Sequence, residues 1–191
     1  VRRWRNEIPT ELQSRLRITG NDLNDFALSW AINSHNSNLP DYTENIEMNH
    51  DRYGSMAQRL PVNGIYFQRM DAKLAMADAS YQWIDIDPFG SPVPFIDSAI
   101  QSLARTGMLE VTATDTAALT GSSLSSQKRR YGAQGIVDDY AHDDAVRVLL
   151  GMIAKTAAMH DRVIKPILSL FDGHHVLSLI HISEPTRRTT I

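Results

Sequence analysis

Short apolar stretches typical of strands alternate along most of the chain with segments that repeat apolar residues at helical spacing. The pattern predicts strands at residues 16–22, 64–69, 81–87 and 107–114. It predicts helices at residues 25–34, after a capping Asn24, and at 74–79, 95–105 and 140–160. Strands that alternate with helices usually form a parallel sheet covered by those helices. The chain is therefore expected to have an α/β fold with a mostly parallel sheet.

Two polar stretches interrupt this alternation. Residues 36–63 are expected to form a long connection or insertion, with a short helix near 53–60. Residues 122–135 are expected to form a loop, and Pro166 to mark the start of another segment.

Composition narrows the class of protein without naming its function. Of the 191 residues, 42% are hydrophobic and 21% charged, as in ordinary soluble domains. No apolar run approaches the ~20 residues that a membrane helix needs, so no membrane segment is expected. The lack of cysteine excludes disulfides and thiolate metal sites and fits the reducing cytoplasm. A net charge of -3 gives no general basic field, but nucleic acid needs only a local basic face.

An acidic residue stands at or just after the carboxyl end of each of three predicted strands: Asp22, Asp71 and Asp87. Open α/β sheets bind ligands at the carboxyl ends of their strands. Asp22 can accept hydrogen bonds from both hydroxyls of a ribose, or it can cap the next helix, as Asn24 could equally well. Asp71 can accept from an adenine amino group while the Ala72 N–H donates to the ring; the alternative is an ordinary turn acid. Together these residues predict a site for a nucleoside-bearing cofactor.

The segment after the third strand carries the most specific chemistry. Asp87 is followed by Pro88 and Phe89, and then by a glycine and a second proline that prevent regular structure. A carboxylate and the free Pro88 carbonyl can accept both N–H bonds of an exocyclic amine and direct its lone pair toward a methyl donor. Phe89 offers a stacking face for a planar base. The alternative is a strand-terminating turn with a core phenylalanine. Asp85, on the same strand face, is expected to be a supporting or buried paired group.

Two motifs and the segments after them resemble one enzyme family. The sequence D-I-D-P-F-G-S-P at 85–92, followed by V-T-A-T-D-T-A at 111–117, resembles the tRNA guanine-26 N2-dimethyltransferase family. Residues 130–133 and the helix from 140 to 162 are similar too, and the resemblance covers about Arg2 to Val176, except the polar insertion.

The resemblance implies a Rossmann-like class I methyltransferase domain that uses S-adenosylmethionine to methylate a guanine N2 at position 26 of tRNA. By position, Asp22 resembles the family's ribose-binding acid, and Asp71 with Ala72 its adenine-contacting pair. Asp87 resembles its catalytic acid, with Pro88 and Phe89 beside it. A related enzyme that methylates adenine N6 or a protein amide remains an alternative, because both use an acid-proline-aromatic strand end.

Both ends of the chain are expected to depart from the family. Residues 1–176 are interpreted as a partial methyltransferase domain, incomplete at the N-terminus, with the family's glycine-containing cofactor loop expected before Arg3. The family's C-terminal RNA-binding domain is also expected to be missing, so an inactive piece that cannot hold its cofactor is a further alternative. Residues 177–191 resemble translated sequencing-adapter DNA and are left out of the predicted fold. The alternative is a genuine strand, Val176 to Ile182, with a polar tail.

Three further groups are candidates for secondary roles. Lys128, Arg129 and Arg130 can contact tRNA phosphates or form an ordinary solvated charge run. Asp115 is expected either to brace the site through its neighbouring threonines or to cap a helix. The histidine pair at 174–175 lacks supporting ligands, so no metal site is expected.

Overall fold

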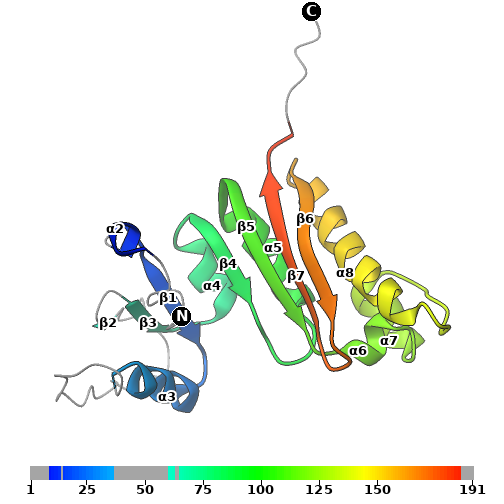
Figure 1. Cartoon of the computed structure of the whole chain (residues 1–191), viewed down its shortest axis with the longest axis horizontal. Helices are drawn as coiled ribbons and strands as arrows, with labels where there is room; N and C mark the ends of the chain where they lie inside the picture. The colour runs from blue at the N-terminus through cyan, green and yellow to red at the C-terminus, as the bar shows by residue number, and fades with distance from the viewer. Residues whose placement is uncertain (1–8, 14, 37–59, 63–64, 186–191) are drawn as a thin grey trace, which may run out of the picture. The chain divides into compact units, whose positions relative to one another are not determined.

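The computed structural model describes residues 9–13, 15–36, 60–62 and 65–185 (Figure 1). The chain divides into two compact units, Val1–Ala75 (unit 1) and Met76–Ile191 (unit 2). Unit 1 holds a three-stranded sheet and unit 2 a four-stranded sheet. In the described part of the chain, none of the helices combines the length and apolar content required to traverse a bilayer.

Unit 1 is a small sheet with one main helix. Its elements are α2 (Thr10–Gln13), β1 (Ile18–Asp22), α3 (Asp25–Asn36), β2 (Leu60–Val62) and β3 (Ile65–Arg69). The strand order is β1-β3-β2, with β1 parallel and β2 antiparallel to β3. Leu28 and Ile32, one turn apart on α3, form the core with Ile65 and Phe67 of β3. The carboxyl ends of β1 and β3 therefore lie side by side.

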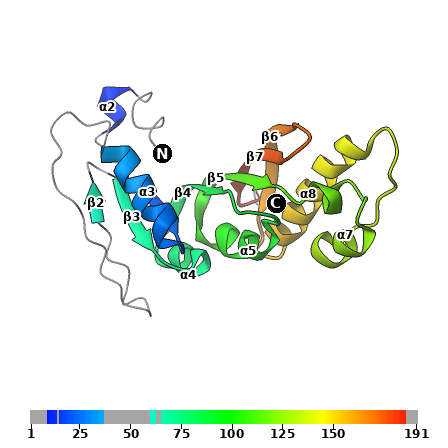
Figure 2. The ribbon, with the colours of Figure 1, turned by 90° about the horizontal axis from the view of Figure 1, so that it is seen from below.

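Unit 2 is a mixed sheet with helices on one face. The helix α4 (Ala72–Ala77) runs from unit 1 into it, and the elements that follow are β4 (Tyr81–Ile86), α5 (Val93–Ser102), β5 (Leu103–Ala113), α6 (Thr116–Leu119), α7 (Leu124–Tyr131), α8 (Ala141–Ala158), β6 (Val163–Phe171) and β7 (Val176–Ser183). The strand order is β4-β5-β7-β6. Figures 1 and 2 show α5 and α8 against the same face of this sheet.

The longest helix owes its position to a narrow apolar stripe. On α8, Ala145, Leu149, Ile153 and Ala157 recur every fourth residue and are fully buried. The small alanines let the helix approach β6 and β7 closely. The opposite side of α8 stays free to form part of the molecular surface.

The α/β class predicted from the sequence is confirmed, and the sheets are mixed rather than mostly parallel. The strand pairs linked through a helix, β1 with β3 and β4 with β5, are parallel. By contrast, β7 pairs antiparallel with both β5 and β6. The short turn between β6 and β7 explains their antiparallel pairing, because a connection of only a few residues can join antiparallel strands but no parallel crossover.

The structure also includes residues that the sequence interpretation left out of the fold. Val176–Ser183 form β7, and its alternate residues Val176, Ser178, Ile180 and Ile182 are fully buried. Their period of two is the pattern of a strand with one covered face, whatever the origin of the codons. The exclusion of these residues from the fold was wrong, while the adapter origin of Leu177–Ile191 stays a prediction.

The polar stretches gave the least accurate expectations. The segment 122–135, expected as a loop, contains the helix α7, and the short helix α6 was not predicted. Most of the predicted insertion, with its helix near 53–60, lies outside the described residues, and β2 is the strand observed at its end.

Candidate functional site

The loop after β4 presents an acid and an aromatic ring to solvent. Ile84 and Ile86 are buried, so β4 is fixed in the sheet up to the residue before Asp87. Asp87 is exposed, and Phe89 is fully exposed. Gly90 has a φ of 81°, a left-handed conformation that favours glycine and turns the chain back toward the sheet. The expected placement of Asp87 and Phe89 at a strand mouth agrees with this geometry, and the alternative of a core phenylalanine does not.

Backbone and side-chain hydrogen bonds tie this loop to the segment after β5. The Gly90 N–H donates to Thr114 Oγ1 at 2.6 Å, and the Thr114 N–H donates to the Gly90 carbonyl at 2.9 Å. Because β4 and β5 are parallel neighbours, their carboxyl ends meet at the same edge. The loop is therefore held at its start by the end of β4, just before Asp87, and at Gly90 by its hydrogen bonds to Thr114.

A buried tyrosine joins the same loop to α7. The Tyr131 hydroxyl donates to Asp115 Oδ1 at 2.6 Å and lies 3.1 Å from Ser91 Oγ. Its single proton goes to Asp115, so Ser91 donates to the tyrosine oxygen. Burial and the bond to Asp115 raise the pKa of Tyr131 above its ordinary value, which keeps the hydroxyl protonated. Asp115 thus braces the loop through Tyr131, and it makes no side-chain capping bond to α6.

The three basic residues at the end of α7 do not share one role. Arg130 Nη1 lies 2.9 Å from Asp115 Oδ2, whose side chain is 9% exposed. Lys128 and Arg129 are exposed, and Arg129 makes a 3.5 Å contact with Ser126. Arg130 therefore belongs to the brace while its side chain stays 41% exposed, and all three basic residues lie on the surface.

Negative charges gather on the strand that leads to Asp87. Asp85 lies opposite Glu110 in the register of β4 with β5 and two residues before Asp87. Partial burial, Glu110 and Asp87, in that order, raise the pKa of Asp85 to about 6. The two acids that contribute to this shift carry like charge, so the structure gives no support to a buried paired group, and the supporting role expected from the sequence stays a prediction. Among the described residues, no group of three or more potential metal ligands is found.

In unit 1 a second cluster of polar groups lies where β1 and β3 end. Asp22 ends β1, Asp71 follows β3 by two residues, and the Asn21 side chain donates to the Met70 carbonyl at 3.0 Å. The structure therefore brings Asp22 and Asp71 to the same edge of one sheet. It assigns Asp87 to unit 2.

Each of these two acids uses one oxygen to organise the local backbone. Asp22 Oδ1 accepts from the Asn24 N–H at 2.7 Å, while Asn24 itself caps α3 through a 2.9 Å bond from the Phe26 N–H. Asp71 Oδ1 accepts from the Lys73 N–H at 2.9 Å, which makes it the cap of α4, whose first residue is Ala72. Asn21 Oδ1 is buried and has no hydrogen-bond partner within the described ranges.

Sequence reasoning missed the residues that hold the loop. Tyr131 and Ser91 lie 40 residues apart, so no local pattern pairs them. The available signal was the spacing of Gln127 and Tyr131, which share one buried helix face. That face is too polar for a periodicity of apolar residues to reveal it.

Comparison with known proteins adds an independent line of evidence. The family model described as N2,N2-dimethylguanosine tRNA methyltransferase matches residues 3–190. A tRNA (guanine(26)-N(2))-dimethyltransferase of Thermoplasma volcanium is 43% identical over 105 residues, covering 55% of this chain and 31% of the relative. Its counterpart from Metallosphaera sedula is 38% identical over 135 residues, covering 70% and 35%. The chain thus spans about a third of the length of these curated relatives.

Among solved structures, the complex of Trm1 from Pyrococcus horikoshii with S-adenosyl-L-methionine is similar with a TM-score of 0.80 and 29% identity. The similarity covers 97% of this chain and 47% of that one.

Proposed function

The chain belongs to the N2,N2-dimethylguanosine tRNA methyltransferase family, and on this premise we propose that it carries the catalytic part of a tRNA methyltransferase. The proposed reaction transfers methyl groups from S-adenosylmethionine to the exocyclic N2 of a guanine, at position 26 of tRNA, in the cytoplasm. The main support is the loop Asp87-Pro88-Phe89, whose acid and ring stand exposed at the end of β4.

The loop suits a weakly nucleophilic amine. The lone pair of guanine N2 is delocalised into the ring, so the reaction requires groups that orient the amine and accept charge from it. The Asp87 carboxylate and the Pro88 carbonyl can each accept one N–H, which directs the lone pair outward. Phe89 can stack on the base, an interaction worth about 1–3 kcal/mol. As nitrogen bonds to the methyl carbon, the bond from that carbon to the sulfur of S-adenosylmethionine would break, S-adenosylhomocysteine would leave, and Asp87 can take the proton that the amine releases.

Unit 1 offers acceptors that fit a nucleoside cofactor. S-adenosylmethionine, when bound, supplies the methyl group. The free oxygen of Asp22 would accept from ribose hydroxyls, and Asp71 with the Ala72 N–H would contact adenine. The buried unpaired Asn21 Oδ1 fits this assignment, since a buried acceptor is costly without a donor. The methyltransferase domain predicted from the sequence for residues 1–176 is extended through β7, because Val176–Ser183 lie between β5 and β6 in its sheet.

The tRNA would meet a basic surface at the end of α7. Lys128 and Arg129 are exposed and are assigned to phosphates. Arg130, predicted from the sequence to share this role, also pairs with Asp115, and because its side chain is 41% exposed it stays assigned to phosphates as well.

The test is Asp87→Ala in the full-length enzyme, read by mass spectrometry of nucleosides from treated tRNA. Loss of a positioned acid–base group should reduce N2-methylguanosine formation by about 10²- to 10⁴-fold. Asp139→Asn, which changes an exposed acid elsewhere in unit 2, serves as the control and should retain activity. Unchanged activity of the Asp87 variant, or methyl groups found on adenine N6 or on protein, would refute the proposal.

A further inference from the structure

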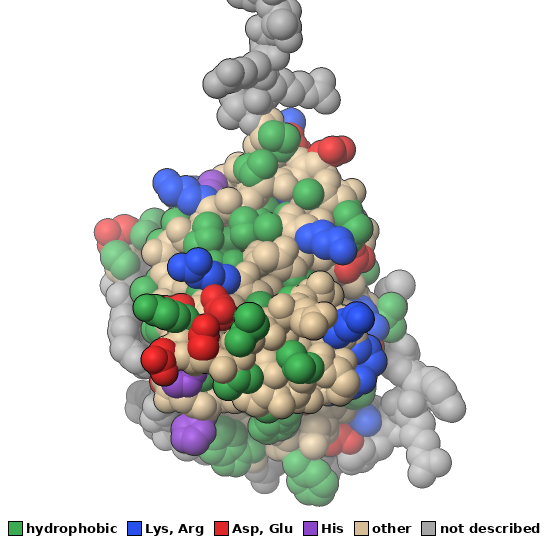
Figure 3. Space-filling model, turned by 90° about the vertical axis from the view of Figure 1, so that its right-hand side faces the viewer, with side chains coloured by type: hydrophobic (Ala, Val, Ile, Leu, Met, Phe, Trp, Pro, Cys, Tyr) green, Lys and Arg blue, Asp and Glu red, His purple; other side chains and the backbone are tan. Residues whose placement is uncertain are grey.

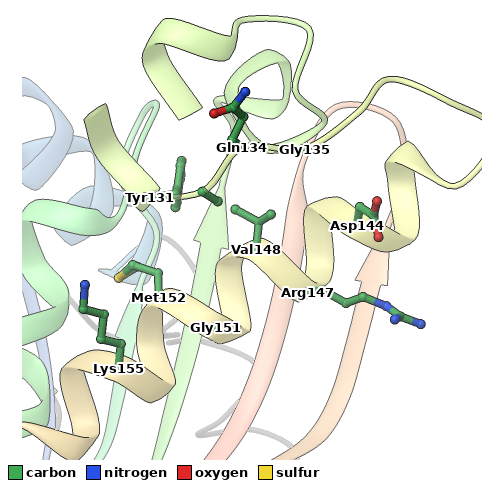
Figure 4. Close-up of a pocket in the computed structure, with 11 residues that line it drawn as sticks. Tyr131, Gln134, Gly135, Asp144, Arg147, Val148, Gly151, Met152 and Lys155 are labelled. Carbon is green, nitrogen blue, oxygen red and sulfur yellow. The ribbon is translucent and has the colours of Figure 1, made fainter. Parts of the chain in front are cut away.

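A groove of about 370 Å³ lies between α8 and the segment that follows α7. One wall consists of residues 132–135, and the other is a side of α8 next to its buried stripe, where Arg147, Gly151 and Lys155 are exposed. Tyr131 lies at the base of the first wall, and Figure 4 shows it opposite Val148 and Met152 of the second. The groove belongs entirely to unit 2.

The first wall is held rigidly by a buried glutamine. Gln127 is 1% exposed, and its amide donates to the Leu119 carbonyl at 3.0 Å. Its Oε1 accepts from the Gly135 N–H at 2.7 Å. A Cβ at Gly135 would come within 3.2 Å of the glutamine nitrogen, so this close approach favours glycine. The wall is therefore preorganised.

The second wall contains a glycine that the fold does not explain. Gly151 lies inside α8, where glycine disfavours the helix relative to alanine. A Cβ built at Gly151 meets no atom within 4 Å, so no neighbour among the described residues excludes a side chain. The missing side chain leaves the groove open at this point, which a bound ligand would require.

Cations flank this opening. Arg147, Gly151 and Lys155 are spaced four residues apart and so form one row along α8. The two cations are ~12 Å apart along the axis, with apolar Val148 and Met152 between them. Figure 4 shows Lys155 at one end and Arg147 at the other, where its guanidinium extends away from Tyr131. Asp144 is the acid among the lining residues, near Arg147 in the first turn of the helix.

The side of unit 2 that Figure 3 displays carries no continuous basic face. On the side of unit 2 that Figure 3 displays, lysine and arginine side chains lie at several separate points, and acidic side chains gather at another.

We infer that the groove binds one nucleotide of the tRNA substrate, with the nucleoside above Gly151 and a flanking phosphate against Lys155. The inference rests on the proposed function. An unpaired nucleotide suits an open groove with an apolar floor and a cationic rim. Tyr131 lines the groove and also binds Ser91 in the loop that carries Asp87. Occupancy of the groove therefore places the tRNA next to the loop that would receive the target guanine.

The test fills the groove without disturbing the helix. In the full-length enzyme, Gly151→Leu adds a side chain where the fold leaves space and improves helix propensity. Its affinity for a labelled, unmodified tRNA transcript should fall about tenfold, with KM raised, kcat at saturating tRNA retained and Tm not lowered. Gly151→Ala is the matched control and should stay within about twofold of the parent.

A second variant tests the phosphate contact. Lys155→Ala should lower the slope of log Kd against log salt concentration by about 1, whereas Lys165→Ala, on β6, should leave it unchanged. An active enzyme whose Gly151→Leu and Lys155→Ala variants bind tRNA as the parent does would overturn the inference and leave the proposed function standing. An enzyme that forms no N2-methylguanosine would refute the proposed function, while the two binding measurements would still decide whether the groove takes RNA.

Discussion

One hydroxyl group joins three segments that are far apart in the sequence. Tyr131, at the end of α7, binds Asp115 after β5 and Ser91 in the loop after β4. The raised pKa of Tyr131 means that this hydroxyl stays a donor over the pH range in which enzymes work. Small errors in the position of a reacting group cost large factors in rate, so this brace should matter for catalysis.

We predict that Tyr131→Phe lowers kcat of the full-length enzyme about tenfold, because the loop with Asp87 loses its anchor. The unfolding free energy should fall by only about 1 kcal/mol, the usual net value of a hydrogen bond. Single-turnover methylation assays and urea unfolding measure the two effects.

Two comparisons separate positioning from general damage. Tyr140→Phe removes the hydroxyl of an exposed tyrosine and should change neither quantity. Because Ser91 acts through Tyr131, adding Ser91→Ala to Tyr131→Phe should cost little more than Tyr131→Phe alone. Fully additive effects on kcat, or an unchanged kcat in Tyr131→Phe, would contradict the positioning role.

Asp85 should make the protein less stable as the pH rises. Its pKa in the fold is about 6, above its ordinary value of 3.8, so the unfolded chain loses this proton first. The fold binds this proton more tightly than the unfolded chain does, and this adds to the free energy of unfolding. The contribution is fully present below pH 3.8 and is lost as the pH rises through about 6. We expect Asp85→Asn to raise the urea midpoint at pH 7.5 and to have little effect at pH 3.5. An equal effect at both pH values would show that Glu110 and Asp87 do not destabilise the ionised carboxylate of Asp85.

The candidate residues differ in how far the sequence could predict them. Asp87 and Phe89 were predictable, because Pro88 and Gly90 end the strand at a known residue and leave the loop residues outside the sheet. The brace role of Arg130 was not, since its partner Asp115 lies 15 residues away and the pairing depends on how α7 folds back.

Among the elements, α8 and α7 show when a helix can be predicted. The stripe of α8 is apolar every fourth residue and was recognised from the sequence. The buried residues of α7 are Gln127 and Tyr131, and the rest of the helix is polar. Its end at Gly132, which adopts a left-handed φ of 64°, is a typical C-terminal cap, but such glycines also occur in loops. Hydrogen bonding, which depends on tertiary partners, stabilises this helix where apolar packing does not.

We predict that Gln127→Leu destabilises unit 2 by about 2–4 kcal/mol, because it leaves the Gly135 N–H and the Leu119 carbonyl without their hydrogen-bond partner. The change nearly preserves volume, so a packing defect contributes little. Gln101→Leu is the control, since Gln101 is exposed on α5 and should alter stability by less than about 0.5 kcal/mol. Equal unfolding midpoints for the two variants would contradict the structural role of Gln127.

For the molecule as a whole, the sequence predicts the class of fold but not the order of the strands. Local patterns give each strand, whereas the order β4-β5-β7-β6 arises from pairings between residues far apart in the chain. The division into two sheets was likewise not predictable from periodicity. Prediction and structure disagree most clearly at residues 177–191. The sequence of this segment resembles translated adapter DNA, yet the fold uses part of it as the inner strand β7.

That disagreement can be settled by removing the segment. Deleting residues 177–191 takes away most of β7, which lies between β5 and β6, together with the fully buried Ile180 and Ile182. Each large buried side chain is worth about 2–5 kcal/mol, and the deletion also exposes two unpaired strand edges. The shortened chain should therefore lose its cooperative unfolding transition, as followed by circular dichroism, and bind the dye ANS. A chain that lacks only residues 186–191 keeps β7 and should unfold like the parent. If both deletions unfold at the parent's midpoint, β7 contributes nothing to stability, as foreign sequence would.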